Sequence, residues 1–147
     1  MADTNIERLT DFFGALPSMA DLPVAASTII LKGTLVALST TGFAIPASSD
    51  STVAKVLGRA ASTVDNRLGA DGELSVHIQY GTYGWDNSAG ADEITIKEIG
   101  QLCYAVDNQT VAKTGTVIAG VVVDVRDDQV RVWSSPLAGI LVEEIDE

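Results

Sequence analysis

The stretch Ala119-Gly-Val-Val-Val-Asp-Val-Arg-Asp-Asp-Gln-Val-Arg-Val-Trp133 decides the fold class of this chain of 147 residues. Two runs rich in β-branched residues, 119–125 and 129–133, flank a polar turn at 126–128, which is the pattern of a β-hairpin. A side-chain period of two predicts a core side made of valines at five positions: Val121, Val123, Val125, Val130 and Val132. The chain is therefore expected to be built from antiparallel strands.

The clearest alternation outside this hairpin covers residues 73–80. Its inward positions are apolar and its outward positions polar: Leu74, Val76, Ile78 and Tyr80 against Glu73, Ser75, His77 and Gln79. Shorter runs between turn residues predict strands at 28–31, 34–38, 42–45, 53–60 and 103–106. A short helix is expected over residues 95–100, with an apolar side made of Ile94, Ile99 and Leu102. We therefore expect a mainly β chain with a compact body of the β-sandwich or β-barrel kind.

The first residues have a different periodicity from the body. Apolar side chains recur at spacings of three and four: Ile6, Leu9, Phe12, Phe13 and Leu16. Thr4 and Glu7 are placed as a capping box, so residues 4–16 predict a short amphipathic helix, with extended backbone before Pro17 and Pro23. These patterns divide the chain into an N-terminal arm at 1–27, a β-rich body at 28–133 and an acidic C-terminal tail at 134–147.

A weak internal repeat is visible in two places. Gly33-Thr-Leu-Val-Ala-Leu38 resembles Gly100-Gln-Leu-Cys-Tyr-Ala105, and Thr-Val-Ala-Lys occurs at both 52–55 and 110–113. Short strands made of small residues can look alike by chance, and a duplicated β-unit gives the same pattern. The sequence leaves both explanations open.

Charge and composition exclude several kinds of partner and site. The 9 lysines and arginines against 20 aspartates and glutamates give a net charge of -11, which opposes binding to nucleic acid and to anionic lipid. The apolar runs fall short of the roughly 20 residues of a membrane helix, and no basic and apolar leader opens the chain, so synthesis in the cytoplasm is expected. With one cysteine, Cys103, and one histidine, His77, the chain cannot form an internal disulfide or a Cys/His zinc site.

No arrangement of residues points to catalysis. His77 is the only candidate base of its kind, and its place among the outward residues of a strand favours a solvated surface histidine. Cys103 lies in an apolar stretch where a thiol usually behaves as a small hydrophobe. The acidic segment 65–73 lacks the alternating ligand spacing of a calcium loop. We expect no enzyme activity, no cofactor and no metal.

Four motifs, in order, carry a resemblance to a known family. They are Leu22-Pro-Val-Ala-Ala-Ser-Thr-Ile-Ile-Leu-Lys-Gly-Thr-Leu-Val-Ala-Leu38; Gly42-Phe-Ala-Ile-Pro-Ala-Ser48; Asp65-Asn-Arg67 with Gly69-Ala-Asp-Gly72; and residues 99–113 followed by Ala119-Gly-Val121 and Asp124. Together they resemble the capsid decoration proteins of tailed bacteriophages, which are also called cement or head-stabilising proteins. The resemblance covers about residues 22–133.

This resemblance implies a β-rich structural protein of the virion. Such proteins bind the outer surface of the expanded head, often as homotrimers at or near threefold sites. There they hold neighbouring major capsid subunits together against internal DNA pressure. The implied partners are the major capsid protein and further copies of the chain, while no interface residue is carried over.

The candidate contacts therefore come from the residues themselves. We expect the arm to dock on the major capsid protein, with residues 23–28, including Pro23 and Val24, adding a strand to an exposed edge. Five apolar anchors are expected to contact the same partner: Ile6, Leu9, Phe12, Phe13 and Leu16. Because aromatic residues are only 5% of the chain, the group of Tyr80, Tyr83 and Trp85 predicts a trimer contact. The arm could instead pack on its own body, and the aromatics could instead cap the chain's own core.

A second class of function stays open at this point. A carbohydrate- or receptor-binding β-domain of a phage head fibre would use exposed Trp85, Tyr83 and Trp133 to stack on sugar faces.

Overall fold

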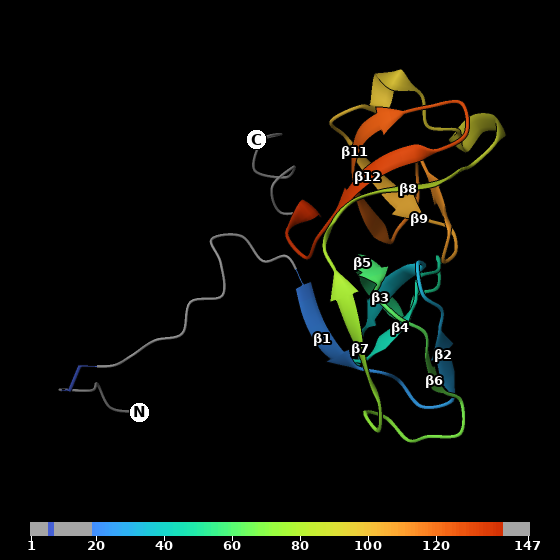
Figure 1. Cartoon of the computed structure of the whole chain (residues 1–147). Coiled ribbons are helices and arrows are strands. Elements are labelled where there is room, and N and C mark those ends of the chain that lie inside the picture. The colour runs from blue at the N-terminus through green and yellow to red at the C-terminus, as the bar shows by residue number, and fades with distance from the viewer. Residues whose placement is uncertain (1–5, 8–18, 140–147) are drawn as a thin grey trace.

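The computed structural model describes residues 6–7 and 19–139 (Figure 1). Within them lie twelve strands and two single 3-10 turns. The strands are β1 Met19–Pro23, β2 Thr28–Ile30, β3 Leu35–Ser39, β4 Ala44–Pro46, β5 Val53–Ala60, β6 Val64–Asn66, β7 Ser75–Gln79, β8 Gly81–Asn87, β9 Leu102–Ala105, β10 Thr110–Ala112, β11 Ile118–Val125 and β12 Val130–Ser134. The 3-10 turns are η1 Gly90–Asp92 and η2 Ile96–Glu98. The predicted mainly β, barrel-like body is confirmed.

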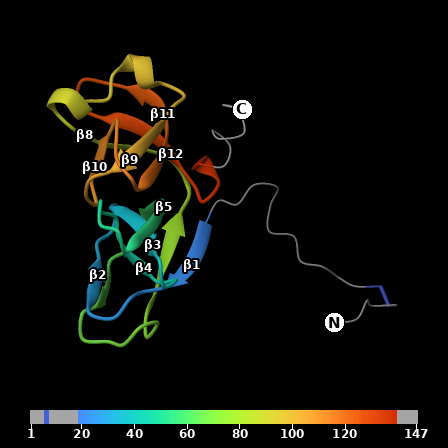
Figure 2. The same cartoon turned by 180° about the vertical axis from the view of Figure 1, so that it is seen from behind.

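The strands form two halves that follow one another along the chain. The first half is a five-stranded sheet in the order β1-β7-β5-β3-β4, accompanied by the small pair β2-β6. The second half is a closed barrel in the order β10-β8-β12-β11-β9. Figures 1 and 2 show the barrel stacked on the sheet, with β7 running directly into β8 between them.

The two halves have the same topology. If β1, β3, β4, β5 and β7 are matched in chain order with β8, β9, β10, β11 and β12, the spatial order of the strands is identical. Within each half the named strand pairs are antiparallel, except that β10 lies parallel to β8 and closes the barrel. The first half has a parallel closing contact in the same place, a single bridge from Val24 to Ala44.

The match extends to register and to irregularities. In β5 the pairing with β3 passes from Val56 to Gly58, and in β11 the pairing with β9 passes from Ile118 to Gly120. Each half therefore has a β-bulge at the residue before a glycine. A Cβ at Gly58 would overlap the carbonyl oxygen of Gln79, and one at Gly120 would overlap that of Trp133, in the next strand. This shared detail favours duplication of one five-stranded unit.

Only one of the two internal sequence repeats falls on equivalent strands of the two halves. The segments beginning at Gly33 and Gly100 run into the equivalent strands β3 and β9, and both glycines have positive φ, 84° and 88°. Those are left-handed conformations that glycine adopts without steric cost. The Thr-Val-Ala-Lys segments fall on β5 and β10, which are not equivalent, so that repeat is a chance match.

Two apolar cores lie on opposite faces of β3. Leu35 and Ala37 contribute to a core that also contains the inner residues of the barrel, so this core joins the halves. Val36 contributes to the second core, which lies between the sheet and β2 and includes Ile30, Val76 and Ile78. A strand covered on both faces must be apolar throughout, which explains the continuous run Leu35-Val-Ala-Leu38.

The predicted strands are largely confirmed, but the face assignments need correction. Val76 and Ile78 are fully buried as predicted, while Leu74 lies before β7 and is 43% exposed. In the 119–133 hairpin Val122 is buried and Val123 is 47% exposed, opposite to the expected phase. The cause is a second bulge, at Val122/Asp124 against β12, together with the bulge before Gly120. A bulge adds one residue and so reverses the alternation beyond it.

Three boundaries also differ from expectation. The body begins at Met19, because β1 pairs along its length with β7, and it continues past residue 133 to Ala138, which is buried. The helix expected over 95–100 is a single 3-10 turn, with Ile94 buried and Ile99 46% exposed. Of the helix expected over 4–16, only Ile6 and Glu7 lie among the described residues, and residues 140–147 of the tail lie outside them.

Candidate functional site

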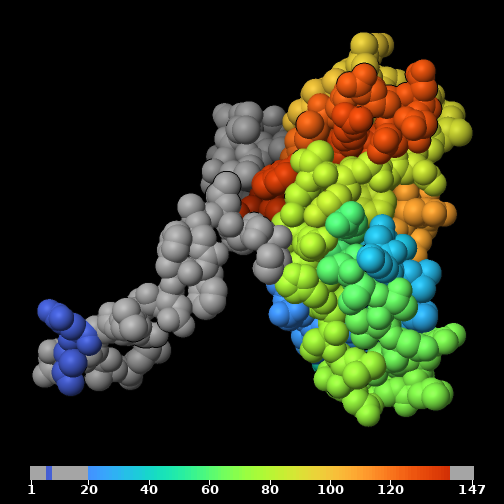
Figure 3. All heavy atoms as spheres, viewed as in Figure 1, coloured from blue at the N-terminus to red at the C-terminus, as the bar shows by residue number. Residues whose placement is uncertain are grey.

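Surface features that the fold itself does not require lie at the two ends of the molecule. The connection from β6 to β7 forms one end, and the connection from β8 to β9 forms the other (Figures 1 and 3). We name residues 65–74 the Leu68 loop and residues 95–100 the Ile96 turn.

The Leu68 loop is held from inside by Asn66, which is 1% exposed. Its Nδ2 donates to the carbonyl oxygens of Val24 at 3.2 Å, Ala25 at 3.0 Å and Ala70 at 3.0 Å. Two carboxylates add further ties, because Glu73 Oε2 accepts from the Ala70 amide at 2.9 Å and Asp71 Oδ1 accepts from the Ala26 amide at 2.7 Å. The loop backbone is therefore fixed against the body before any partner binds.

The start of the Leu68 loop carries an ion pair. Arg67 donates from Nε to Asp65 Oδ1 at 2.9 Å and from Nη2 to Asp65 Oδ2 at 2.7 Å. Hydrogen bonds from the Arg67 side chain, then from its backbone amide, lower the pKa of Asp65 from 3.8 to about 2. Asp65 is ionised at neutral pH, and its charge is balanced by Arg67.

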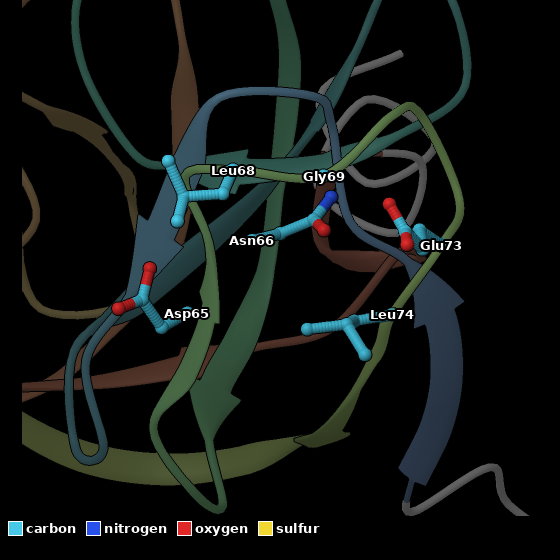
Figure 4. A pocket seen from close by; sticks show the side chains of 6 residues that line it. All are labelled: Asp65, Asn66, Leu68, Gly69, Glu73 and Leu74. Atoms are coloured by element: carbon cyan, nitrogen blue, oxygen red, sulfur yellow. The ribbon is translucent and has the colours of Figure 1, made fainter.

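The outer side of this fixed loop is apolar. Leu68 is 104% exposed and Leu74 is 43% exposed. They border an open hollow of about 250 Å³, whose lining is shown in Figure 4: Asp65, Asn66, Leu68, Gly69, Glu73 and Leu74. A leucine held fully in water on an ordered backbone offers a partner contact area at little cost in loop entropy.

The Ile96 turn is equally well fixed. Thr95 and Glu98 form a capping box, in which the Thr95 amide donates to Glu98 Oε1 at 2.8 Å and the Lys97 amide donates to Thr95 Oγ1 at 3.3 Å. The hydrogen bond from the Thr95 amide lowers the pKa of Glu98, which is buried. Asn87 ties the preceding residue through two bonds with the backbone of Ile94, at 2.8 and 2.9 Å.

Three β-branched aliphatic side chains are exposed at this end. Ile96 is 73% exposed and Ile99 is 46% exposed, and residues three apart in a 3-10 turn lie on one side. Val123 is 47% exposed and lies beside them, because the Gly100 amide donates to the Val122 carbonyl at 2.7 Å. Stiff side chains on a fixed turn form a second preformed apolar contact surface.

The structure places some of the predicted arm residues in the body of the chain, and others lie outside the described residues. Pro23 and Val24 belong to the chain's own body, and Val24 is fully buried, so the prediction that Val24 binds a capsid subunit is wrong. Ile6 is described and is 75% exposed. The other anchors lie outside the described residues: Leu9, Phe12, Phe13 and Leu16.

The aromatic group packs inside its own chain. Trp85 is 6% exposed within the core of the barrel, which leaves little of its side chain for a contact between subunits. Tyr83 is half-buried, lies edge-to-face with Trp85 at 6.5 Å and has the Arg59 guanidinium 4.3 Å above its ring. Tyr80 packs against the other core, and burial raises the pKa of its hydroxyl. Capping of the chain's own core accounts for these three residues.

The titratable residues singled out in the sequence form no reactive group. His77 Nδ1 lies 2.8 Å from Asp21 Oδ1 on the sheet surface. Burial raises the pKa of the Cys103 thiol to about 12, so it is not a nucleophile at neutral pH. Across residues 19–139, with Ile6 and Glu7, no three of His, Cys, Asp and Glu are grouped to hold a metal ion. In the same part of the chain no helix is long and apolar enough to span a membrane.

Sequence reasoning did not single out either of the two exposed apolar surfaces. The Asp65-Asn-Arg67 and Gly69-Ala-Asp-Gly72 motifs were visible, and their role is now explained by the hydrogen bonds of Asn66 and Asp71. An exposed leucine inside such a motif was the available signal. No protein-family model, curated protein or solved structure matches the chain, so the family resemblance rests on its motifs.

Proposed function

We propose that the chain is a viral structural protein that decorates the outer surface of the expanded head of a tailed bacteriophage and cements neighbouring major capsid subunits. The observation that carries the proposal is the pair of preformed apolar surfaces, the Leu68 loop and the Ile96 turn, at opposite ends of a duplicated β-frame. The ordered motifs between residues 22 and 133 support the same family.

Two separate contact surfaces are what a cement protein needs. A chain that touches one capsid subunit at each end makes its second contact intramolecular, so two weak contacts combine into firm binding. Repetition over a symmetric shell then multiplies the gain. Rigid ends also transmit force between the subunits instead of absorbing it in loop motion.

The charge of the chain is compatible with this location. A net charge of -11 disfavours contact with DNA and keeps free copies soluble before they assemble. We further propose that the copies bind as homotrimers at or near threefold sites. The half-buried Tyr83 and Tyr80 and the buried Trp85 are engaged in their own chain, so the trimer contact is expected elsewhere on the surface.

Binding to purified heads tests the proposal. The wild-type chain is expected to sediment with expanded heads and not with unexpanded ones. Leu68→Ser, and Ile96→Ser together with Ile99→Ser, should each weaken binding by about tenfold or more, the loss expected when one of two linked contacts fails. Leu137→Ser changes a leucine that is 42% exposed, close to the 46% of Ile99, away from both ends, and should bind normally. Absence of binding by the wild-type chain, or equal binding by all variants, would overturn the proposal.

The head-fibre alternative loses one of its three aromatic residues. A sugar platform needs an exposed ring, and Trp85 is 6% exposed, while Tyr83 and Trp133 are half-buried.

A further inference from the structure

The hollow beside the Leu68 loop has a mixed lining that suits one kind of side chain. The lining combines the apolar side chains of Leu68 and Leu74 with the polar side chains of Asn66 and Glu73 (Figure 4). We propose that this hollow receives a lysine side chain of the partner protein, with its ammonium group bound by Asn66 Oδ1 and Glu73. Only the identity of that partner, the major capsid protein, rests on the proposed function.

The first argument is an unused acceptor on a buried residue. Three carbonyl oxygens surround Asn66 Nδ2 at 3.0 to 3.2 Å, which fixes the orientation of the amide because an oxygen in that place would be repelled. Asn66 Oδ1 accepts no hydrogen bond from any described residue, although Asn66 is 1% exposed. Asn66 borders the hollow, so a donor from outside the chain can reach this oxygen.

The second argument is an uncompensated charge. Glu73 uses Oε2 to accept from the Ala70 amide, and no cationic side chain in the described part of the chain pairs with it. Asp65, the other acid in the lining, is already paired with Arg67. The hollow therefore has one unpaired negative charge, on the exposed Glu73, which favours a cation there.

The third argument is the absence of a side chain at position 69. A Cβ on Gly69 would overlap Asn66 Oδ1 and come within 2.6 Å of Glu73 Oε2. Glycine thus allows the two acceptor oxygens to lie close together against the backbone of residue 69, where any side chain would displace them. A lysine combines an aliphatic stem, which matches Leu68 and Leu74, with an ammonium group of three donors, which matches the two acceptors.

Nuclear magnetic resonance of the full ¹⁵N-labelled chain tests the site without any capsid. The probe is Nα-acetyl-lysine methylamide, and its norleucine analogue is the uncharged control. Lysine, and not norleucine, should shift the amide signals of Asn66, Gly69 and Glu73 and the side-chain NH₂ of Asn66. Glu73→Gln keeps the acceptor for the Ala70 amide and should weaken binding about three- to fivefold, the usual size of a partly exposed ion pair.

The control variant is Asp127→Asn, which removes the same charge from a distant exposed turn and should bind the probe as the wild type does. Equal shifts with norleucine, equal losses in both variants, or no shifts at these residues would overturn the lysine site. These results are independent of head binding. A chain that sediments with heads but ignores lysine refutes only this inference, and the reverse result refutes only the proposed function.

Discussion

The two halves of the molecule share a frame and differ in their connections. In both halves five strands follow the same order, with a bulge before a glycine in the fourth strand of each unit. In the first half β2 and β6 pair with each other and present the Leu68 loop, whereas in the second half a tight turn joins β11 to β12 and 3-10 turns lie between β8 and β9. The frame is common to both halves, and the connections give the two ends different exposed apolar surfaces.

The largest difference between equivalent positions is expected in the cores. Leu22 and Trp85 lie at equivalent points of β1 and β8, opposite Val76 and Val130. Trp85 is buried and Leu22 is half-buried, so Trp85→Ala should lower the free energy of unfolding by about 4 kcal/mol and Leu22→Ala by about 2 kcal/mol. Urea unfolding measures both. Light scattering should give an unchanged oligomer mass for Trp85→Ala. A fall in mass would instead support the prediction that Trp85 lies in the trimer interface.

A second comparison concerns the two bulge glycines. Gly58→Ala and Gly120→Ala should each destabilise the chain by about 3 kcal/mol, because the new Cβ overlaps a backbone carbonyl in both places. Gly90→Ala meets open space at a positive φ of 71° and should cost only about 1 kcal/mol. If one of these glycines tolerates alanine and the other does not, the two bulges are not equivalent, and the proposed match between the halves is contradicted.

A third comparison tests how the two ends are fixed. Asn66→Ala leaves three carbonyl oxygens without their donor and should cost about 2 kcal/mol, while Asn87→Ala removes two bonds to Ile94 and should cost about 1 kcal/mol. Thermal unfolding measures the stability, and amide hydrogen exchange shows which end opens. If mutation of Asn66 reduced protection from hydrogen exchange in the Ile96 turn, the two ends would not be fixed independently of each other.

The sequence predicted the strands better than it predicted their faces. Alternation located β7, β11 and β12, because period two survives in any strand with one wet face. It failed around Val123, where a bulge reverses the phase without leaving a mark in composition. β1 and β8 were missed because proline or glycine interrupts their patterns. Their antiparallel partners also lie more than 40 residues away in sequence, such as Ile78 for Ala20 and Val130 for Trp85.

The contact residues were less predictable for a physical reason. Scarce aromatic residues suggested an interface, yet large rings also fill small cores, and burial of Trp85 decided between the two uses. Leu68 looked like an ordinary loop residue in the sequence. Its importance depends on the long-range hydrogen bonds from Asn66 to Val24 and Ala25, which only the folded chain reveals.

The smallest expected effect is the pH dependence of the Leu68 loop. The folded pKa of Asp65, about 2, lies below the ordinary value of 3.8, so pairing with Arg67 stabilises the loop fully above pH 3.8. That contribution is lost as the pH falls from 3.8 towards 2. An NMR titration of the carboxyl signals should give Asp65 a midpoint of about 2 in the wild type and a midpoint near 3.8 in Arg67→Gln. A midpoint near 3.8 in the wild type would mean that the ion pair is not formed in solution.

Electron microscopy of expanded heads carrying the bound protein tests the central claim most directly. The account predicts density on the outer surface in which each copy touches one major capsid subunit through the Leu68 loop and a neighbouring subunit through the Ile96 turn. Density in which each copy contacts a single subunit, with either end free in solvent, would contradict it.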